Sequence, residues 1–83
     1  MDKKTEIRVR EVLTGLSGIG DFPEDAELQR DLGFDSIRLV TLLLMLEETF
    51  GITLEEADMN PFDLVTVRQV VALAEKYTSE KTP

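Results

Sequence analysis

The stretch Asp31-Leu32-Gly33-Phe34-Asp35-Ser36-Ile37 stands directly before a segment that is almost free of polar residues. Apolar residues at helical spacing predict a helix that begins at Ser36 or Ile37 and runs to about Phe50. Gly51 would end it, because glycine suits a left-handed C-terminal cap. The chain contains no histidine and no cysteine. The hydroxyl of Ser36 therefore lies at a helix start in a chain without histidine, the side chain that most often activates a serine nucleophile.

Size and composition describe one small domain. The chain has 83 residues, of which 42% are hydrophobic and 31% charged, so we expect a single domain, residues 1–83, ordered over about 5–77 and ending in a flexible tail, 78–83. Seventeen acidic residues against nine basic ones give a net charge of −8, which argues against nucleic-acid partners. We find no membrane span, signal peptide or metal motif, and we expect a cytoplasmic monomer.

The region before Ser36 combines a helix with a long loop. Helical spacing predicts a first helix over about residues 4–16, which the glycines that follow would end. From Gly18 to Asp35 the periodicity is lost, and a loop of this length inside a small domain is usually functional. We expect it to be held against the core by its scattered apolar residues Ile19, Phe22, Leu28, Leu32 and Phe34.

Two capping boxes follow, each a threonine with Glu or Gln three residues later. The first, Thr53 with Glu56, predicts a short helix that ends before the Asn-Pro pair. The second, Thr66 with Gln69, predicts the last helix, over about residues 67–77. Together with the helices before them, these segments make an all-α protein.

On a helical wheel with about 100° between residues, the helix after Ser36 has more apolar residues than a core-facing stripe needs. Its core side consists of Leu39, Leu42, Leu43, Leu46 and Phe50. Ile37, Val40 and Leu44 lie off that stripe, and Met45 lies within the polar side. Such a surplus either forms an exposed patch, which tends to mark a binding surface, or is covered by the long loop. The wheel alone does not decide between these alternatives.

A serine just before a helix is most often only an N-cap. A cap, however, does not need Leu32-Gly33-Phe34 ahead of it. A serine that another enzyme must reach does need an anchored loop, a flexible glycine and a projecting position. A phosphate attached there would also lie at the positive end of the helix dipole. The position of Ser36 therefore suits a phosphodiester.

This seven-residue stretch resembles the phosphopantetheine attachment motif of acyl carrier proteins, whose core is Asp-Ser-Leu, with Ile37 in the place of the leucine. The similarity extends over nearly all of residues 5–77. It implies a four-helix bundle with a short third helix, and a phosphopantetheine arm from coenzyme A attached to Ser36 beside the acidic neighbour Asp35. The thiol of the arm would carry acyl groups. The implied partner-facing residues are Ile37, Val40, Leu44, Met45, Glu47 and Glu48.

Two departures from fatty-acid carriers affect the expected pathway. Arg38 and Thr41 stand where those carriers place acids, and residues 52–66 form a longer segment. Within it, residues 58–63 resemble free-standing carriers of polyketide and nonribosomal peptide pathways, or D-alanyl carriers. We expect such a carrier, with the carriers of fatty-acid synthesis and of D-alanine as alternatives. Its partners would be a phosphopantetheinyl transferase, an acyl- or aminoacyl-loading enzyme, and ketosynthase, condensation or tailoring enzymes.

A helical adaptor that binds a partner helix, with Ser36 as an unmodified cap, is the alternative from another class. A hydrolase is disfavoured because no histidine can act as its base. We therefore expect no catalytic residue in this chain.

Overall fold

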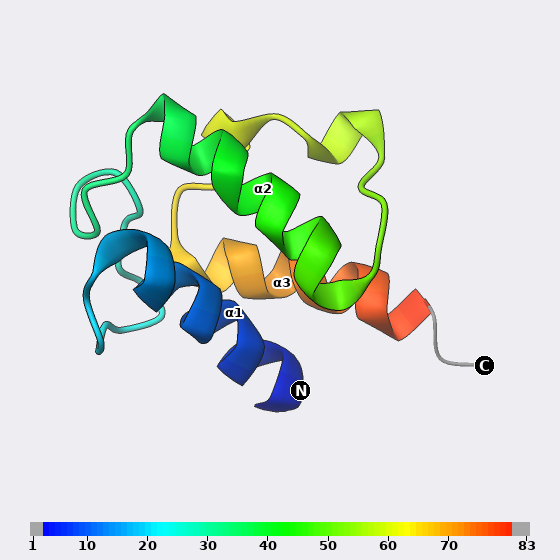
Figure 1. Cartoon of the computed structure of the whole chain (residues 1–83), viewed down its shortest axis with the longest axis horizontal. Coiled ribbons are helices and arrows are strands. Elements are labelled where there is room, and N and C mark those ends of the chain that lie inside the picture. Colours follow the sequence, from blue (N-terminus) through cyan, green and yellow to red (C-terminus); the bar gives the residue numbers. More distant parts are fainter. Residues whose placement is uncertain (1–2, 81–83) are drawn as a thin grey trace.

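The computed structural model describes residues 3–80, and the side chains of residues 3–78. Three α-helices and two short 3-10 turns follow one another along the chain (Figure 1): α1 (Lys3–Ser17), α2 (Ser36–Phe50), η1 (Glu56–Asp58), η2 (Pro61–Asp63) and α3 (Val67–Glu80). No strand occurs within residues 3–80, where one isolated backbone bridge joins Glu27 to Thr66. The all-α class is confirmed, and no helix in this range is long and apolar enough to cross a membrane.

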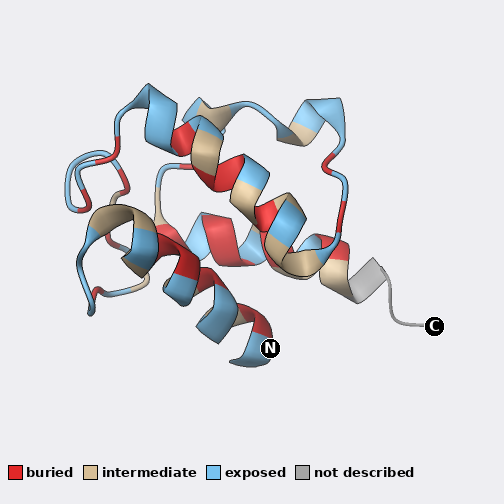
Figure 2. Ribbon diagram, viewed as in Figure 1, coloured by how far each residue is buried: buried red, intermediate tan, exposed pale blue. Residues whose placement is uncertain are grey.

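The core lies between the three helices, where α1 contacts both α2 and α3. Figure 2 shows buried residues along all three helices and in parts of the loops that join them. From α2 the core takes Leu39, Leu42, Leu43 and Leu46, all at most 1% exposed. Phe50, which the wheel also assigned to the core, is half-buried at its edge.

The long loop between α1 and α2 is held in place by four of the five apolar residues expected to do so. These are Phe22, Leu28, Leu32 and Phe34, which are buried. Ile19 is exposed, so the prediction was wrong for this residue, which lies in the open start of the loop. The loop is thus packed against the core over the part that leads to α2.

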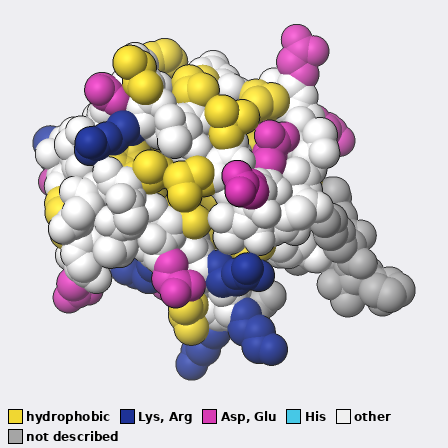
Figure 3. Space-filling model, viewed as in Figure 1, with side chains coloured by type: hydrophobic (Ala, Val, Ile, Leu, Met, Phe, Trp, Pro, Cys, Tyr) yellow, Lys and Arg dark blue, Asp and Glu magenta, His cyan; other side chains and the backbone are white. Residues whose placement is uncertain are grey.

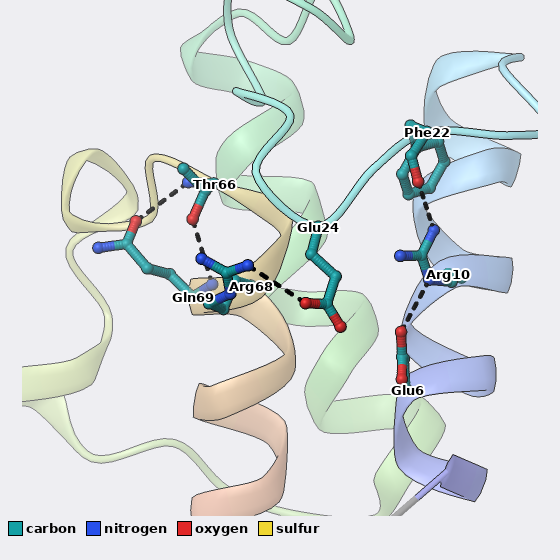
Figure 4. A network of polar contacts seen from close by, with 7 residues as sticks. All are labelled: Glu6, Arg10, Phe22, Glu24, Thr66, Arg68 and Gln69. Carbon is teal, nitrogen blue, oxygen red and sulfur yellow. Dashed lines mark hydrogen bonds and ion pairs between the residues drawn. The ribbon is translucent and has the colours of Figure 1, made fainter.

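Polar contacts tie the same loop to α1 and α3 (Figure 4). Arg10 donates to the backbone oxygen of Phe22 over 2.6 Å, and Arg68 on α3 pairs with Glu24 over 3.3 Å. The predicted capping box of α3 is confirmed: Thr66 Oγ1 accepts from the Gln69 backbone N–H, and Gln69 Oε1 accepts from that of Thr66. These contacts fix where the loop approaches α2.

The short third helix predicted after Thr53 appears only as the 3-10 turn η1, which ends before the Asn-Pro pair as expected, and a second turn, η2, follows it. Thr53 caps nothing: η1 follows Glu55, which is extended and makes no side-chain cap. The N–H of Leu54 donates to the Glu47 carboxylate, and that of Glu55 donates to the Tyr77 hydroxyl. The backbone is thus extended at Glu55, where the capping box requires a helix. Residues 3–80 therefore contain three α-helices, and the predicted four-helix bundle is not confirmed.

The last helix is longer than its apolar pattern predicted. α3 continues to Glu80, so residues 78–80 are helical although we expected them in the tail. Residues 81–83, the rest of that tail, lie outside the described residues.

Two leucines of α2, Leu44 and Leu46, differ in how far they are buried. Leu46 is fully buried, whereas Leu44 is 51% exposed. We expect Leu46→Ala to lower the free energy of unfolding by about 2 to 5 kcal/mol, since it leaves a cavity. Leu44→Ala should lower it by less than about 1 kcal/mol, as for other exposed positions. Urea unfolding of both variants tests this assignment, and equal losses would contradict it.

Candidate functional site

Ser36 is the first residue of α2 and is exposed. The N-cap of this helix is Asp35, whose carboxylate accepts the backbone N–H of Arg38 over 2.8 Å. Among the described residues, the Ser36 hydroxyl makes no hydrogen bond. The capping role that a serine often plays at this point is thus taken by its neighbour. The Ser36 oxygen is left free to react.

The loop ahead of Ser36 is anchored on both sides of one glycine. Leu32 and Phe34 are buried, and the N–H of Phe34 donates to the Leu28 oxygen over 2.9 Å. Between them, Gly33 adopts a φ of 72°, a conformation that glycine reaches without steric cost. A side chain at Gly33 would meet no atom within 4 Å, so backbone conformation rather than space requires glycine here. The loop therefore presents Ser36 from a fixed position.

An apolar patch follows Ser36 on the outer side of α2. We define the α2 patch as Ile37, Val40 and Leu44, which are 74%, 46% and 51% exposed. Figure 3 shows hydrophobic side chains gathered over the upper part of this face, with acidic groups beside them. The long loop does not cover the patch, so the alternative left open by the wheel is resolved in favour of exposure.

Met45 does not share this face. It is half-buried, packs against the core, and lines a cleft of about 340 Å³ together with Arg8, Glu48 and Thr49. The wheel placed Met45 on the polar side because it describes one helix alone, whereas α1 covers that side of α2. Met45 was expected in the exposed partner interface, but it is half-buried and does not belong to the α2 patch.

The two glutamates near the end of α2 have different environments. Glu47 is half-buried, and its carboxylate accepts the N–H of Leu54 over 2.8 Å. Glu48 is exposed and lines the cleft beside Met45. Glu47 thus has a structural role that its sequence position did not indicate, and only Glu48 offers a free acidic group at the surface.

Tyr77 fastens the segment that contains η1 to α3. Its hydroxyl accepts the N–H of Glu55 over 2.8 Å and donates to the Asp58 carboxylate over 2.5 Å. Lys76 also donates to Asp58, over 3.0 Å. The Tyr77 hydrogen bond, followed by that of Lys76, lowers the pKa of Asp58 from its ordinary value of 3.8, and the bond to Asp58 raises the pKa of Tyr77. These contacts position the start of the segment that passes beside α2.

Sequence reasoning did not single out Phe62, which is 60% exposed although aromatic. It sits in η2, a turn capped by the side chain of Asn60 and containing Pro61. The Asn-Pro pair is a turn signal that could have placed it. Exposure cannot be derived from such a local signal.

Comparison with known proteins identifies the family. The model of the phosphopantetheine attachment site matches residues 8–74. The chain belongs to the acyl carrier protein family. An acyl carrier protein of Thermotoga maritima is 32% identical over 71 residues, covering 83% of this chain and 85% of that protein. One from Saccharopolyspora erythraea is 35% identical over 68 residues, covering 78% of this chain and 72% of that protein.

The prosthetic group of this carrier chain is a covalently attached phosphopantetheine. The structure fits such a group, because an exposed serine with an unused hydroxyl lies at the N-terminus of a 15-residue helix, where a phosphate is favoured. Within residues 3–80, no cluster of three or more metal-ligating side chains occurs.

The contact between Tyr77 and Asp58 should make stability depend on pH. Because folding lowers the pKa of Asp58, its contribution is present above about pH 4 and is lost as the pH falls through the folded pKa. Asp58→Asn should therefore lower the free energy of unfolding at about pH 7, and its difference from the unaltered chain should shrink towards about pH 3.

Urea unfolding at both pH values measures this difference. Asp63→Asn is the matched control, since Asp63 is exposed and its side chain makes no hydrogen bond or ion pair within residues 3–78. It should leave stability at neutral pH nearly unchanged. A difference for Asp58→Asn that grows on acidification would show that the sign is wrong.

Proposed function

We propose that this chain is a free-standing carrier whose phosphopantetheine arm is attached to Ser36, and that it holds acyl or aminoacyl groups as thioesters on that arm. The observation that carries the proposal is the division of roles between Asp35 and Ser36. Asp35 caps α2, so the exposed Ser36 hydroxyl can be modified without removing a hydrogen bond on which the helix depends.

We propose that an enzyme makes the attachment to Ser36, since the chain has no histidine to act as a base for the serine proton. The serine oxygen forms a bond to the phosphorus that carries pantetheine in coenzyme A. The bond from that phosphorus to the bridging oxygen breaks, adenosine bisphosphate leaves, and the serine proton goes to a base of the transferase. The N-terminus of α2 then stabilises the phosphodiester charge. We propose that the chain itself catalyses no step.

We propose a polyketide or nonribosomal peptide pathway in preference to fatty-acid synthesis or D-alanine transfer. Two features of the surface support this choice. Arg38 is exposed in the first turn of α2, and Thr41 bonds the Ile37 oxygen, so this turn lacks an acidic strip. The segment between α2 and α3 also carries two turns rather than one helix. The partners that contact α2 should accordingly rely more on apolar contact than those of an acidic helix.

An unmodified adaptor that grips a partner helix through the α2 patch is the second candidate. The exposure of Ile37, Val40 and Leu44 favours it as much as it favours a carrier. It requires no reaction at Ser36, so Ser36→Ala would leave its activity intact. A carrier with the same substitution would be inactive.

Intact mass spectrometry tests the proposed attachment. Incubated with coenzyme A and a broad-specificity phosphopantetheinyl transferase, the unaltered chain should gain the mass of one phosphopantetheine group, and Ser36→Ala should gain none. Ser17→Ala, which alters a serine at the end of α1, should behave like the unaltered chain. The proposal would be refuted if the Ser36→Ala variant gained the group, or if the unaltered chain did not.

The pathway is tested on the modified chain by offering it candidate loading enzymes one at a time. Loading by an enzyme that activates amino acids other than D-alanine would support the nonribosomal assignment, and loading with D-alanine alone would support D-alanine transfer. Loading by a malonyl transferase alone would leave the polyketide and fatty-acid assignments and exclude the aminoacyl one.

A further inference from the structure

We infer that the arginines nearest Ser36 protect the thioester on the arm, because they supply positive charge there without a primary amine that could take the acyl group. The inference rests on the proposed function and adds a chemical requirement to it. A carrier that presents a reactive thioester has to avoid acylating its own side chains. The choice between arginine and lysine near Ser36 therefore affects how long the cargo stays on the arm.

Arginine and lysine are distributed differently along the chain. Residues 5–75 contain five cationic side chains, and all of them are arginines: Arg8, Arg10, Arg30, Arg38 and Arg68. The four lysines stand on either side of this range, at positions 3, 4, 76 and 81. Position 81 lies outside the described residues. Every cation in the long segment that contains Ser36 is thus a guanidinium group.

The lysines of α1 lie towards the far end of α2. Arg8 lies over the ring of Phe50, the last residue of α2, at 5.6 Å from the ring centroid. Lys3 and Lys4 precede Arg8 by about one helical turn or more. Ser36, the first residue of α2, is about 21 Å from Phe50 along the helix. Figure 1 shows the start of α1 and the start of α2 at opposite sides of the molecule.

The third described lysine, Lys76, is paired with a carboxylate. Its amine lies 3.0 Å from the Asp58 carboxylate, in the segment that follows the end of α2. The hydrogen bond to Asp58 raises the pKa of Lys76, which keeps its amine protonated. A protonated amine has no free electron pair for attack on a thioester. Lys76 therefore combines a position late in α3 with a charge state that makes it unreactive.

Arginines supply the cations closer to Ser36. Arg38 is exposed in the first turn of α2, two residues after Ser36, and its side chain makes no ion pair within residues 3–78. Arg30 pairs with Glu27 over 3.0 Å in the loop that leads to Ser36. A lysine could form the same kind of ion pair, so charge alone does not require arginine at these positions.

The two cations differ in their reactivity towards a thioester. A lysine amine has a pKa of about 10.4, so about 1% of it is neutral at about pH 8.5. The neutral nitrogen attacks the thioester carbonyl carbon, the bond from that carbon to sulfur breaks, an amide forms, and the proton lost by nitrogen goes to the released sulfur. A guanidinium group stays protonated at this pH and does not react in this way.

Tethering makes this reaction faster for an amine near Ser36. A group on a short flexible tether meets its neighbours at an effective concentration of about millimolar, which falls towards zero where the tether cannot reach. An amine at position 38 lies about 3 Å along α2 from the attachment point. It would therefore meet the acyl group far more often than an amine beside Phe50.

Formation of the amide tests the inference. A broad-specificity phosphopantetheinyl transferase and acetyl-coenzyme A load the acetylated arm, and the excess acetyl-coenzyme A is then removed. After incubation at about pH 8.5, hydroxylamine cleaves the remaining thioester but not an amide. Peptide mass spectrometry of Arg38→Lys should then find acetyl at residue 38. This acetyl should form at a rate independent of protein concentration and at least about tenfold faster than at any lysine of the unaltered chain.

Arg8→Lys is the matched control. It also places an amine at an exposed position of a helix, but beside Phe50 at the other end of α2. Residue 8 should be acetylated at least about tenfold more slowly in this variant than residue 38 is in Arg38→Lys. Urea unfolding should give nearly the same midpoint for both variants as for the unaltered chain, since both positions are exposed.

The possible results have separate meanings. Equal acetylation rates in Arg38→Lys and Arg8→Lys would overturn the inference while the proposed function stands. The same holds if no amide forms at residue 38, or if a lysine of the unaltered chain is acetylated as fast. If the unaltered chain takes no arm from acetyl-coenzyme A, the proposed function fails first and the inference fails with it.

Discussion

The hydrogen bond from the Arg38 backbone N–H to the Asp35 carboxylate is the constraint on which the proposed site depends. A helix start leaves backbone donors unsatisfied, and one side chain near it must usually accept from them. Because Asp35 does this, Ser36 can occupy the first helical position without a structural duty. The buried Leu32 and Phe34 on either side of Gly33 then fix the direction from which the chain enters α2.

Packing divides α2 into two functional sides. Its leucines at 39, 42, 43 and 46 meet α1 and α3 in the core, and this burial holds the helix firmly enough to serve as a platform. The side turned outward keeps the α2 patch, and η2 extends the apolar surface with Phe62. Most apolar side chains of α2 are thus either buried in the core or exposed in the α2 patch.

The sequence was sufficient for features decided by neighbours along the chain. The α-helices and the box at Thr66 follow from local spacing and local hydrogen bonds. The box at Thr53 does not form: the chain is still extended at Glu55, and the N–H groups that follow Thr53 donate to Glu47 and Tyr77, 7 and 22 residues away from their donors. Met45 was misplaced because a wheel ignores the neighbouring helix, and Phe62 was missed because no periodicity governs exposure in a turn.

The division of roles between Asp35 and Ser36 is tested most directly by unfolding the two alanine variants in urea, side by side. Asp35→Ala should lower the free energy of unfolding by about 0.5 to 2 kcal/mol, the usual cost of losing an N-cap. Ser36→Ala should change it by less than about 0.5 kcal/mol. A larger loss for Ser36→Ala than for Asp35→Ala would contradict the account, because the serine hydroxyl would then support the helix rather than stand free for the arm.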